Sequence, residues 1–513
     1  THYGEDEAVF TLDLRLDADF SHLFEVKHEI QMTRQAQSRL GSYQQRVSQG
    51  GRLQRFSYAH GQRTRQLDLE LSQQPVVEDG RSRFNLSLAP GETWRLGVSF
   101  LPLNGAQPAT HAAHVAHAAH AAPGVVPRDD AREKLLERHQ RYRDKLVAAA
   151  PNLQTDSLLL RRAYEQSVHD FAALQIAAEE TAEDEFIIAA GIPWFMTLFG
   201  RDSLIAAYQA LPFFPEAAMG TLRALARLQG TKVDKLRAEE PGKILHEYRS
   251  PSFTGTEYSG AIFPYYGTID ATPLFLVLLA DVCRVTGDVT IARELREHAL
   301  RALDWMAQYG DRDGDGYIEY VKEAGWGLDN QGWKDSGDAV RYRSGELARP
   351  PIALCEVQGY AYAARAGMAR VFDMLGEPAR AAALRQEANA LKERFNRDYW
   401  MPECGYYAFG LDGQKRQIDA ITSNPGHLLW SGIADGDKAR LVAERLVTPE
   451  LFSGWGVRTL ATSQGGYNPI SYHLGSVWPH DNSLIVAGLA RYGHTEPASR
   501  IVTGLLRALD YSP

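Results

Sequence analysis

Residues 270–309 read DATPLFLVLLADVCRVTGDVTIARELREHALRALDWMAQY, and this stretch decides the fold. An almost continuous apolar run predicts a helix over 270–286, and a second helical pattern covers 289–309. Between them, Gly287 and Asp288 supply a stop signal and a start signal. A connection this short places two helices side by side and antiparallel. The stretch therefore predicts one pair of packed helices.

The same pattern continues from residue 155 to the end of the chain, with almost no strand signal. Connections of a few residues alternate with connections of roughly 20–40 residues, which exceed the usual loop length. Short turns on one side and long, aromatic, charged loops on the other predict a toroid of paired helices with one functional face. The long connections are 180–201, 231–269, 310–354, 398–424 and 447–479. The predicted helices are 155–178, 202–211, 215–229, 270–286, 289–309, 355–375, 378–397, 425–434, 436–446, 480–492 and 496–511.

Composition excludes several classes of function. The net charge of −9 argues against nucleic acid or an anionic membrane as a partner and fits a neutral substrate. The apolar run at 271–283 is too short to span a membrane, and the first residues do not resemble a signal peptide, so we expect a cytoplasmic protein. Neither a disulfide framework nor a zinc site is indicated by the widely spaced Cys283, Cys355 and Cys404. The sequence leaves the oligomeric state open.

A different pattern precedes the helices. Alternating apolar residues predict strands at 9–16, 65–71, 83–88 and 93–100, separated by turn signals such as Asp79-Gly80. We expect a β-rich domain over 1–108, a linker with a charged helix over 109–150, and the helical domain over 151–513. Within the linker, a low-complexity stretch offers two readings: metal ligands along one helical face, or an alanine-rich linker with incidental histidines, which we favour. These histidines are His111, His114, His117 and His120.

The loop at 310–340, GDRDGDGYIEYVKEAGWGLDNQGWKDSGDAV, mixes acidic groups with indole and phenol rings. An aromatic ring stacks on the apolar face of a sugar, and a partly desolvated carboxyl has its pKa raised enough to protonate a leaving oxygen. The alternative is a solvated acidic turn. Within this loop Trp333-Lys334-Asp335 places a carboxyl close to an indole and a cation, and its nearest competitors as catalytic carboxyl are Asp329 and Asp338.

Three other loops carry similar mixtures. In 191–203 (GIPWFMTLFGRDS), adjacent Arg201 and Asp202 can grip vicinal sugar hydroxyls, although an N-capping Asp beside a surface Arg explains the same letters. The segments 243–249 (KILHEYR) and 264–270 (PYYGTID) suit hydroxyl binding, or contain a structural tyrosine pair. In 475–482 (GSVWPHDN), Trp478 forms a sugar platform or is a buried ring at a helix entry. The candidate substrate-binding residues are Trp194, Phe199, Arg201, Asp202, His246, Glu247, Tyr266, Asp270, Trp333, Trp478 and His480.

A metal-binding pattern also occurs in the 310–340 loop. Asp311, Asp313 and Asp315 follow the calcium-loop spacing DxDxDG, but Lys322 stands where a bidentate Glu normally completes such a site. A tight Asp/Gly turn explains the same residues, and we prefer it. We expect no cofactor, and calcium remains an open alternative. The motifs GxSxG, GxxxxGK[ST] and HExxH are absent, so the available catalytic groups are carboxylates.

Several motifs in order resemble the bacterial glycogen-debranching, amylo-α-1,6-glucosidase-like family. They are LFGRDS, KILHEYR, YYGTIDATPLF, DGDGYIEY, GWKDS, FSGWGVRTL and GSVWPHDN, and the likeness covers roughly 129–513. That family is similar to the inverting (α/α)6-barrel glucosidases, which include glucoamylases, trehalases and processing α-glucosidases. The segment 18–27 (ADFSHLFEVK) looks like the end of the β-rich domain that precedes the barrel in those proteins. The resemblance thus implies an (α/α)6 barrel after a partial β-sandwich-like domain.

The resemblance also implies roles. Arg201 and Asp202 correspond to the pair that holds the terminal glucose in glucoamylase-type enzymes, and Asp335 falls in the loop that carries the general acid. The family places its general base between the eleventh and twelfth barrel helices. Our eleventh predicted helix ends near Tyr511, so we expect the base and a twelfth helix beyond Pro513, in a longer protein.

These expectations describe an inverting, exo-acting α-glucosidase whose partner is an oligo- or polysaccharide α-glucoside. The first reading is debranching of α-1,6 stubs in glycogen. A second is hydrolysis of a small α-glucoside such as trehalose, sucrose or glucosylglycerate. A third, from another class, is a carbohydrate-binding protein that lacks the general base and does not turn substrate over.

Overall fold

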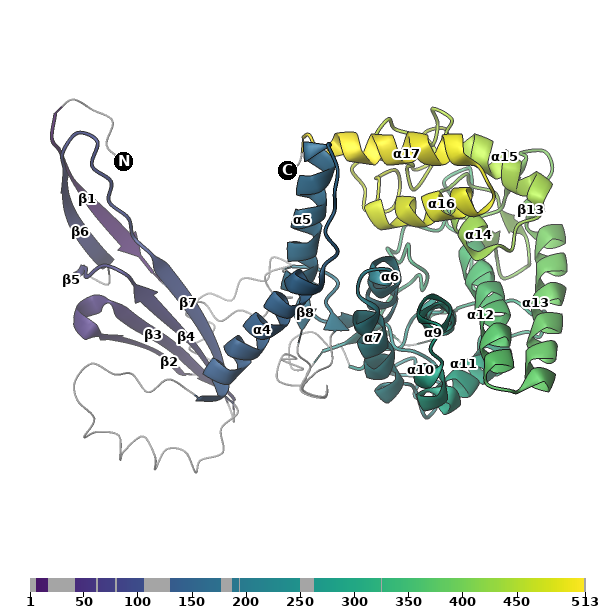
Figure 1. The fold of residues 1–513 in the computed structure, drawn as a ribbon, viewed down its shortest axis with the longest axis horizontal. Coiled ribbons are helices and arrows are strands. Elements are labelled where there is room, and N and C mark those ends of the chain that lie inside the picture. The colour runs from purple at the N-terminus through teal and green to yellow at the C-terminus, as the bar shows by residue number, and fades with distance from the viewer. Residues whose placement is uncertain are drawn as a thin grey trace. The chain divides into compact units, whose positions relative to one another are not determined.

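The computed structural model describes residues 6–16, 42–60, 63–78, 81–105, 130–176, 187–192, 194–249, 263–323 and 325–511. Its contacts divide the chain into two compact units, with a boundary between Lys134 and Leu135. The first unit is built of strands and the second mostly of helices (Figure 1). The histidine-rich stretch at 110–122 and the segment 18–27 lie outside the described residues.

The described part of the first unit contains two antiparallel sheets. One has the order β1-β6-β5, with β1 at Ala8–Arg15, β6 at Arg81–Leu88 and β5 at Val76–Glu78. The other has the order β2-β3-β4-β7, with β2 at Ser42–Ser48, β3 at Leu53–His60, β4 at Arg63–Leu71 and β7 at Val98–Gly105. A small apolar core is formed by Phe56, Leu69, Leu71 and Phe84.

Three of the four predicted strands are confirmed as β1, β4 and β6. The fourth begins later than predicted, because β7 pairs with β4 only from Val98, which lies opposite Leu71. Just before it, Trp94 packs its ring against Phe84 at a centroid distance of 5.3 Å instead of extending the strand. Strands β2, β3 and β5 were not predicted, since sequences such as SYQQRVS lack apolar alternation.

The second unit follows the predicted succession of helices. It begins within α4 (Asp130–Ala149), and the predicted helix at 289–309 is divided into two. The others are α5 (Leu158–Ala173), α6 (Gly200–Ala210), α7 (Pro215–Arg227), α9 (Ala271–Thr286), α10 (Thr290–Glu294), α11 (Arg296–Gln308), α12 (Cys355–Met374), α13 (Pro378–Asp398), α14 (Pro425–Ser431), α15 (Gly436–Leu446), α16 (Pro479–Arg491) and α17 (Thr495–Ala508).

Consecutive helices pack as pairs: α6 with α7, α9 with α11, α12 with α13, α14 with α15, and α16 with α17 (Figure 1). The first member of each pair also contacts the first member of the next, so α6, α9, α12, α14 and α16 form an inner row. The second members lie outside this row. This arrangement is the predicted toroid of paired helices.

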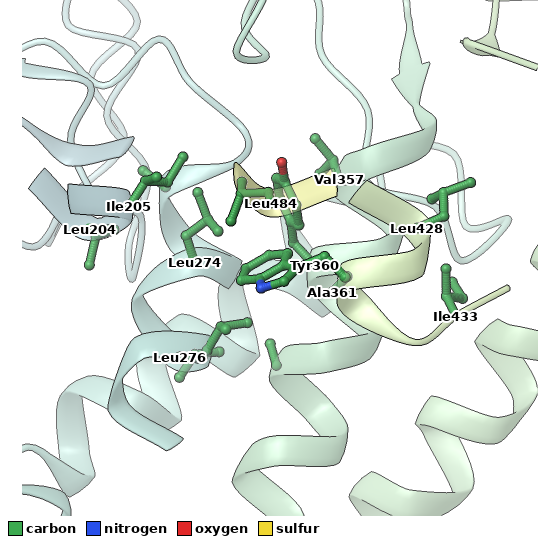
Figure 2. Close-up of a cluster of buried hydrophobic side chains, with 14 of the residues drawn as sticks. Leu204, Ile205, Leu274, Leu276, Val357, Tyr360, Ala361, Leu428, Ile433 and Leu484 are labelled. Atoms are coloured by element: carbon green, nitrogen blue, oxygen red, sulfur yellow. The ribbon is translucent and has the colours of Figure 1, made fainter. Parts of the chain in front are cut away.

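The inner helices surround the main hydrophobic core (Figure 2). Figure 2 shows Leu204 and Ile205 of α6, Leu274 of α9, Tyr360 of α12 and Leu484 of α16 directed into one cluster. Each large apolar side chain buried this way contributes about 1.5–3 kcal/mol. Helix α9 is apolar on all sides because neighbours cover it on all sides. Among the described residues, no helix combines the length and apolarity that a membrane crossing requires.

Glycine allows two inner helices to approach closely. A Cβ added to Gly488 of α16 would lie 2.4 Å from the backbone nitrogen of Trp430 in α14. On the opposite helix, a Cβ at Gly426 would lie 2.4 Å from Cγ1 of Ile485. Both positions therefore require a residue without a side chain.

Loop length determines where the functional face lies. The turns that follow the inner helices, 211–214, 287–289, 375–377, 432–435 and 492–494, are short. The connections that precede α9, α12, α14 and α16 are long. All long loops therefore meet the amino-terminal ends of the inner helices, which confirms the prediction of a single loop-bearing face.

Candidate active site

The amino-terminal turns of the inner helices bring polar residues together. Arg201 and Asp202 lie in the first turn of α6, and Asp270 is the N-cap residue of α9. Glu356 and Asp481 occupy the first turns of α12 and α16. Because a helix amino terminus carries a partial positive charge, carboxylates are favoured at these positions. Several helix dipoles therefore point toward one acidic cluster.

Arg201 is the centre of this cluster. Its Nη1 donates to Oδ2 of Asp270 at 2.9 Å and to the carbonyl oxygen of Gly332 at 3.0 Å. Its Nη2 donates to Oδ2 of Asp335 at 2.7 Å. Burial alone would lower the pKa of Arg201, but the charges of Asp270, Asp335 and Asp202 raise it, so the guanidinium stays charged. One arginine thus holds carboxylates from two distant loops.

Asp335 has the electrostatics of a proton donor. Its side chain is 21% exposed, and burial raises its pKa to about 6. Arg201 opposes this rise, whereas the negative charges of Asp202 and Asp270 add to it. No hydrogen bond to its Oδ1 comes from the described residues, so this oxygen can carry a proton toward a ligand. Near neutral pH the carboxyl therefore exchanges between its protonated and ionised forms.

The two competing carboxylates lack such surroundings. The side chain of Asp329 is 67% exposed and pairs with Nζ of Lys322 at 2.9 Å. Asp338 is also exposed. Neither side chain is desolvated as that of Asp335 is. Of the three aspartates, Asp335 alone is both partly desolvated and in contact with Arg201.

Aromatic rings lie close to the acid. Trp333 is buried, and its ring centroid lies 5.0 Å from that of His480 and 6.2 Å from that of Trp478. Trp478 is the N-cap residue of α16, and its Nε1 donates to the carbonyl oxygen of Tyr472 at 2.9 Å. Burial lowers the pKa of His480 to about 4, so its imidazole is neutral. The structure therefore brings the predicted residues Trp333, Trp478 and His480 together in one aromatic cluster.

Four of the remaining predicted residues form two pairs. Phe199 and His246 lie beside Arg201: their rings meet at 5.4 Å, and the charge of Arg201 adds to the burial that lowers the pKa of His246. The carbonyl oxygen of Trp194 accepts a hydrogen bond from Nη2 of Arg249 at 3.0 Å. That arginine also pairs with Glu247. Trp194 and Glu247 are thus tied to each other through one guanidinium.

Tyr266 lies in a different environment. It is buried in the main core, and its hydroxyl donates to the carbonyl oxygen of Leu228 at 2.7 Å. The adjacent Tyr265 lies nearer the acid, since its hydroxyl accepts from the backbone nitrogen of Leu328 at 3.0 Å and its ring lies 4.7 Å from Trp326. The charge of Asp335 adds to the burial that raises the pKa of Tyr265.

Further polar residues lie close to Trp333 that were not among the predicted site residues. His427 Nε2 hydrogen-bonds Oδ1 of Asp481 at 2.8 Å, and its ring stacks on Trp333. Within the described chain, the other oxygen of Asp481 and the indole nitrogen of Trp333 have no hydrogen-bond partner. Buried polar atoms without partners usually face water or a ligand. The sequence feature that could have identified these residues is a polar side chain in the first turn of an otherwise apolar helix.

In the loop with the calcium-like spacing, the carboxylates already have ion-pair and hydrogen-bond partners within the protein. Carboxyl oxygens of Asp311, Asp313 and Asp315 come within 4.8 Å of one another. Lys415 Nζ lies 2.8 Å from Asp313, 2.6 Å from Asp315 and 2.9 Å from Glu319, and we call these four residues the Lys415 cluster. Both oxygens of Asp311 accept backbone N–H groups of the turn. A lysine ammonium therefore already neutralises the carboxylates that a calcium ion would bind.

Two parts of the chain match known protein families. Residues 263–512 match the family model of the mannosylglycerate hydrolase MGH1-like glycoside hydrolase domain. Residues 1–99 match the N-terminal domain of some glycogen debranching enzymes. No curated protein sequence matches the chain.

Similar solved structures include a mannosylglycerate hydrolase of family GH63 from Thermus thermophilus. Its complex with Tris is 16% identical, with 63% of this chain and 88% of that chain covered and a TM-score of 0.49. Its complex with glucose is 17% identical, with the same coverage and a TM-score of 0.48. The domain match at 263–512, which spans the acidic cluster from Asp270 to Asp481, agrees with the toroid and its carboxylates. Residues 263–512 therefore form a glycoside hydrolase domain, folded as a toroid of paired helices.

Proposed function

We propose that the helical unit hydrolyses α-glucosidic bonds with inversion and that Asp335 is its general acid. The contact between Asp335 and Arg201, together with the raised pKa of Asp335, carries this proposal. Inverting hydrolysis uses one carboxyl to protonate the glycosidic oxygen and a second to activate water about 6.5–9.5 Å away. Asp335 takes the first of these roles.

The chemistry follows from the geometry around the acid. Protonated Asp335 donates its proton to the oxygen between the two sugars as the bond to that oxygen breaks. The aspartate then carries a negative charge, which the guanidinium of Arg201 stabilises from 2.7 Å. Arg201 and Asp202 also offer donors and acceptors to vicinal hydroxyls of the terminal glucose. Trp194, Phe199, His246, Trp333, Trp478 and His480 provide ring surfaces and polar groups around that sugar.

The charges favour a neutral substrate. Arg201 faces three carboxylates, namely Asp202, Asp270 and Asp335, so an anionic leaving group would meet net negative charge. The match of 1–99 to the N-terminal domain of some glycogen debranching enzymes also supports a glucan. We therefore propose debranching of α-1,6 stubs as the principal activity.

A second candidate is hydrolysis of a small α-glucoside, of the trehalose, sucrose or glucosylglycerate type. The match of 263–512 to a mannosylglycerate hydrolase-like domain favours it. Under this alternative an acidic aglycone would need a cation near Asp335 that is not already committed to a carboxylate.

The two candidates are separated by product release from matched substrates. The full-length protein is incubated with glycogen limit dextrin, trehalose, sucrose and glucosylglycerate, and the anomer of released glucose is followed by NMR. Debranching predicts β-glucose from limit dextrin and at least tenfold lower kcat/KM for the small glucosides, a difference of about 1.4 kcal/mol in transition-state binding. Initial release of α-glucose would refute inversion, and activity confined to glucosylglycerate would refute the neutral-substrate proposal.

A further inference from the structure

Lys334 is a buried cation directly before the acid in the sequence. Its side chain is only 2% exposed, and lysine is rarely buried so completely without a partner. Its Nζ donates to the carbonyl oxygen of Thr459 at 2.6 Å. The same nitrogen lies over the rings of Trp333 and Phe409, at 4.9 and 5.4 Å from their centroids. Burial lowers the pKa of Lys334 to about 8, against the charges of the buried carboxylates Asp481 and Glu356.

The acceptor of this hydrogen bond belongs to another loop of the site. Thr459 is fully buried, and its backbone nitrogen donates to the carbonyl oxygen of Ser476 at 2.9 Å. Its hydroxyl oxygen accepts from the backbone nitrogen of Gly475 at 2.8 Å. These contacts anchor Thr459 to the segment that leads into Trp478. Lys334 therefore connects the loop of the acid to the loop that carries the aromatic residues.

The residue after the acid is tied to the same loop. Oγ of Ser336 and Nδ1 of His473 share a hydrogen bond of 2.9 Å. Burial lowers the pKa of His473 to about 3, so the neutral ring can accept this bond from the serine hydroxyl. Asp335 is thus flanked on both sides by residues bonded to the connection between α15 and α16 (447–478), while its own side chain contacts Arg201.

We propose that Lys334 is a positioning residue for proton transfer, which holds Asp335 against Arg201 by anchoring its loop to Thr459. The inference rests on the proposed role of Asp335 as general acid. A displacement of about 1 Å at a reacting group can cost about 10²-fold in rate. Because Lys334 acts through Asp335, its effect is confined to steps that need the acid. A lysine that merely fills the core would affect all substrates through folding alone.

The test compares two leaving groups in the full-length protein. Lys334→Met keeps the length of the side chain but removes its donor and charge. A matched control is Lys392→Met: Nζ of Lys392 also donates to a backbone carbonyl, that of Gly432 at 3.0 Å, and lies over the ring of Tyr362, but on the outer helix α13. The substrates are an α-linked disaccharide, whose leaving oxygen needs a proton, and α-glucosyl fluoride, whose leaving group needs little acid assistance.

We expect Lys334→Met to lower kcat for the disaccharide by about 10²-fold, with KM and the rate on the fluoride within about threefold of wild type. Lys392→Met should leave both rates within about threefold. The double variant Lys334→Met/Asp335→Asn should be no slower on the disaccharide than Asp335→Asn alone, because both changes remove the same step. Equal losses on both substrates, or multiplied losses in the double variant, would overturn the proposal.

Ser336→Ala serves if Lys334→Met does not fold. It removes the hydrogen bond to His473 on the other side of Asp335, and we expect a smaller loss of kcat that is again confined to the disaccharide. An equal loss on both substrates would contradict the proposal that these hydrogen bonds position Asp335. The proposed function fails in a different way: wild type would hydrolyse neither substrate, or Asp335→Asn would itself lose activity equally on both.

Discussion

Replacing Asp335 with Asn tests the assignment of the acid most directly. An amide has nearly the shape of the carboxyl but cannot supply a proton at neutral pH. Removal of a general acid costs about 10²–10⁴-fold in rate. We therefore expect kcat on an α-linked disaccharide to fall by that factor. Sugar affinity, measured by calorimetry with glucose, should remain within several-fold, because Arg201 and Asp202 are still present.

The pH dependence of kcat/KM provides a second, independent test of Asp335 as the acid. With a pKa of about 6, Asp335 is about 91% protonated at pH 5 and about 9% protonated at pH 7. The alkaline limb of kcat/KM should therefore centre near pH 6, and kcat/KM should fall about tenfold between these two pH values. An aspartate with an ordinary pKa would already be about 94% ionised at pH 5. The variant should lose this limb altogether.

The assay is the release of glucose from the disaccharide and from α-glucosyl fluoride between pH 4 and 8. Because fluoride departs with little proton assistance, Asp335→Asn should retain most of its rate on that substrate. Two results would refute the reasoning. One is near-normal turnover of the disaccharide by Asp335→Asn, which would transfer the role to Asp329 or Asp338. The other is an unchanged alkaline limb in the variant.

Three further changes test the electrostatics and the fold. The negative charge of Asp202 raises the pKa of Asp335, so Asp202→Asn should move the alkaline limb of kcat/KM to lower pH; a shift to higher pH would contradict this. Lys415→Met leaves the carboxylates of its cluster without a cation and should destabilise the unit by about 1–2 kcal/mol, less than for a fully buried pair because Lys415 is 32% exposed. Millimolar calcium should raise the melting temperature of that variant and not that of wild type. Phe275→Ala, at a fully buried position of α9, should cost about 3–5 kcal/mol in denaturant unfolding, whereas the half-exposed Phe213→Ala should cost much less.

Local patterns predicted the helices well, because apolar periodicity and terminal Gly or Pro residues are properties of short segments. The paired arrangement followed from alternating connection lengths. The division of 289–309 into α10 and α11 was not predicted, since the apolar pattern continues through Leu295, which ends one helix and precedes the next. The β unit was predicted less completely, because its polar strands depend on pairing partners rather than on their own sequence.

The site shows where sequence reasoning ends. The spacing of 134 residues between Arg201 and Asp335 gives no indication that their side chains meet, and only the family resemblance linked them. The adjacent Tyr265 and Tyr266 are alike in sequence, yet backbone geometry sends one toward the acid and the other into the core. Likewise, the calcium-like spacing gave no sign that Lys415, about 100 residues away, supplies the cation.

The polar groups of the site come from the first turns of helices that lie as far apart in the chain as α6 and α16. No short fragment can therefore assemble it, and separating any two neighbouring inner helices disperses its charges while each helix keeps its own hydrogen bonds. During gradual denaturation, enzymatic activity should thus vanish while circular dichroism still reports nearly full helicity.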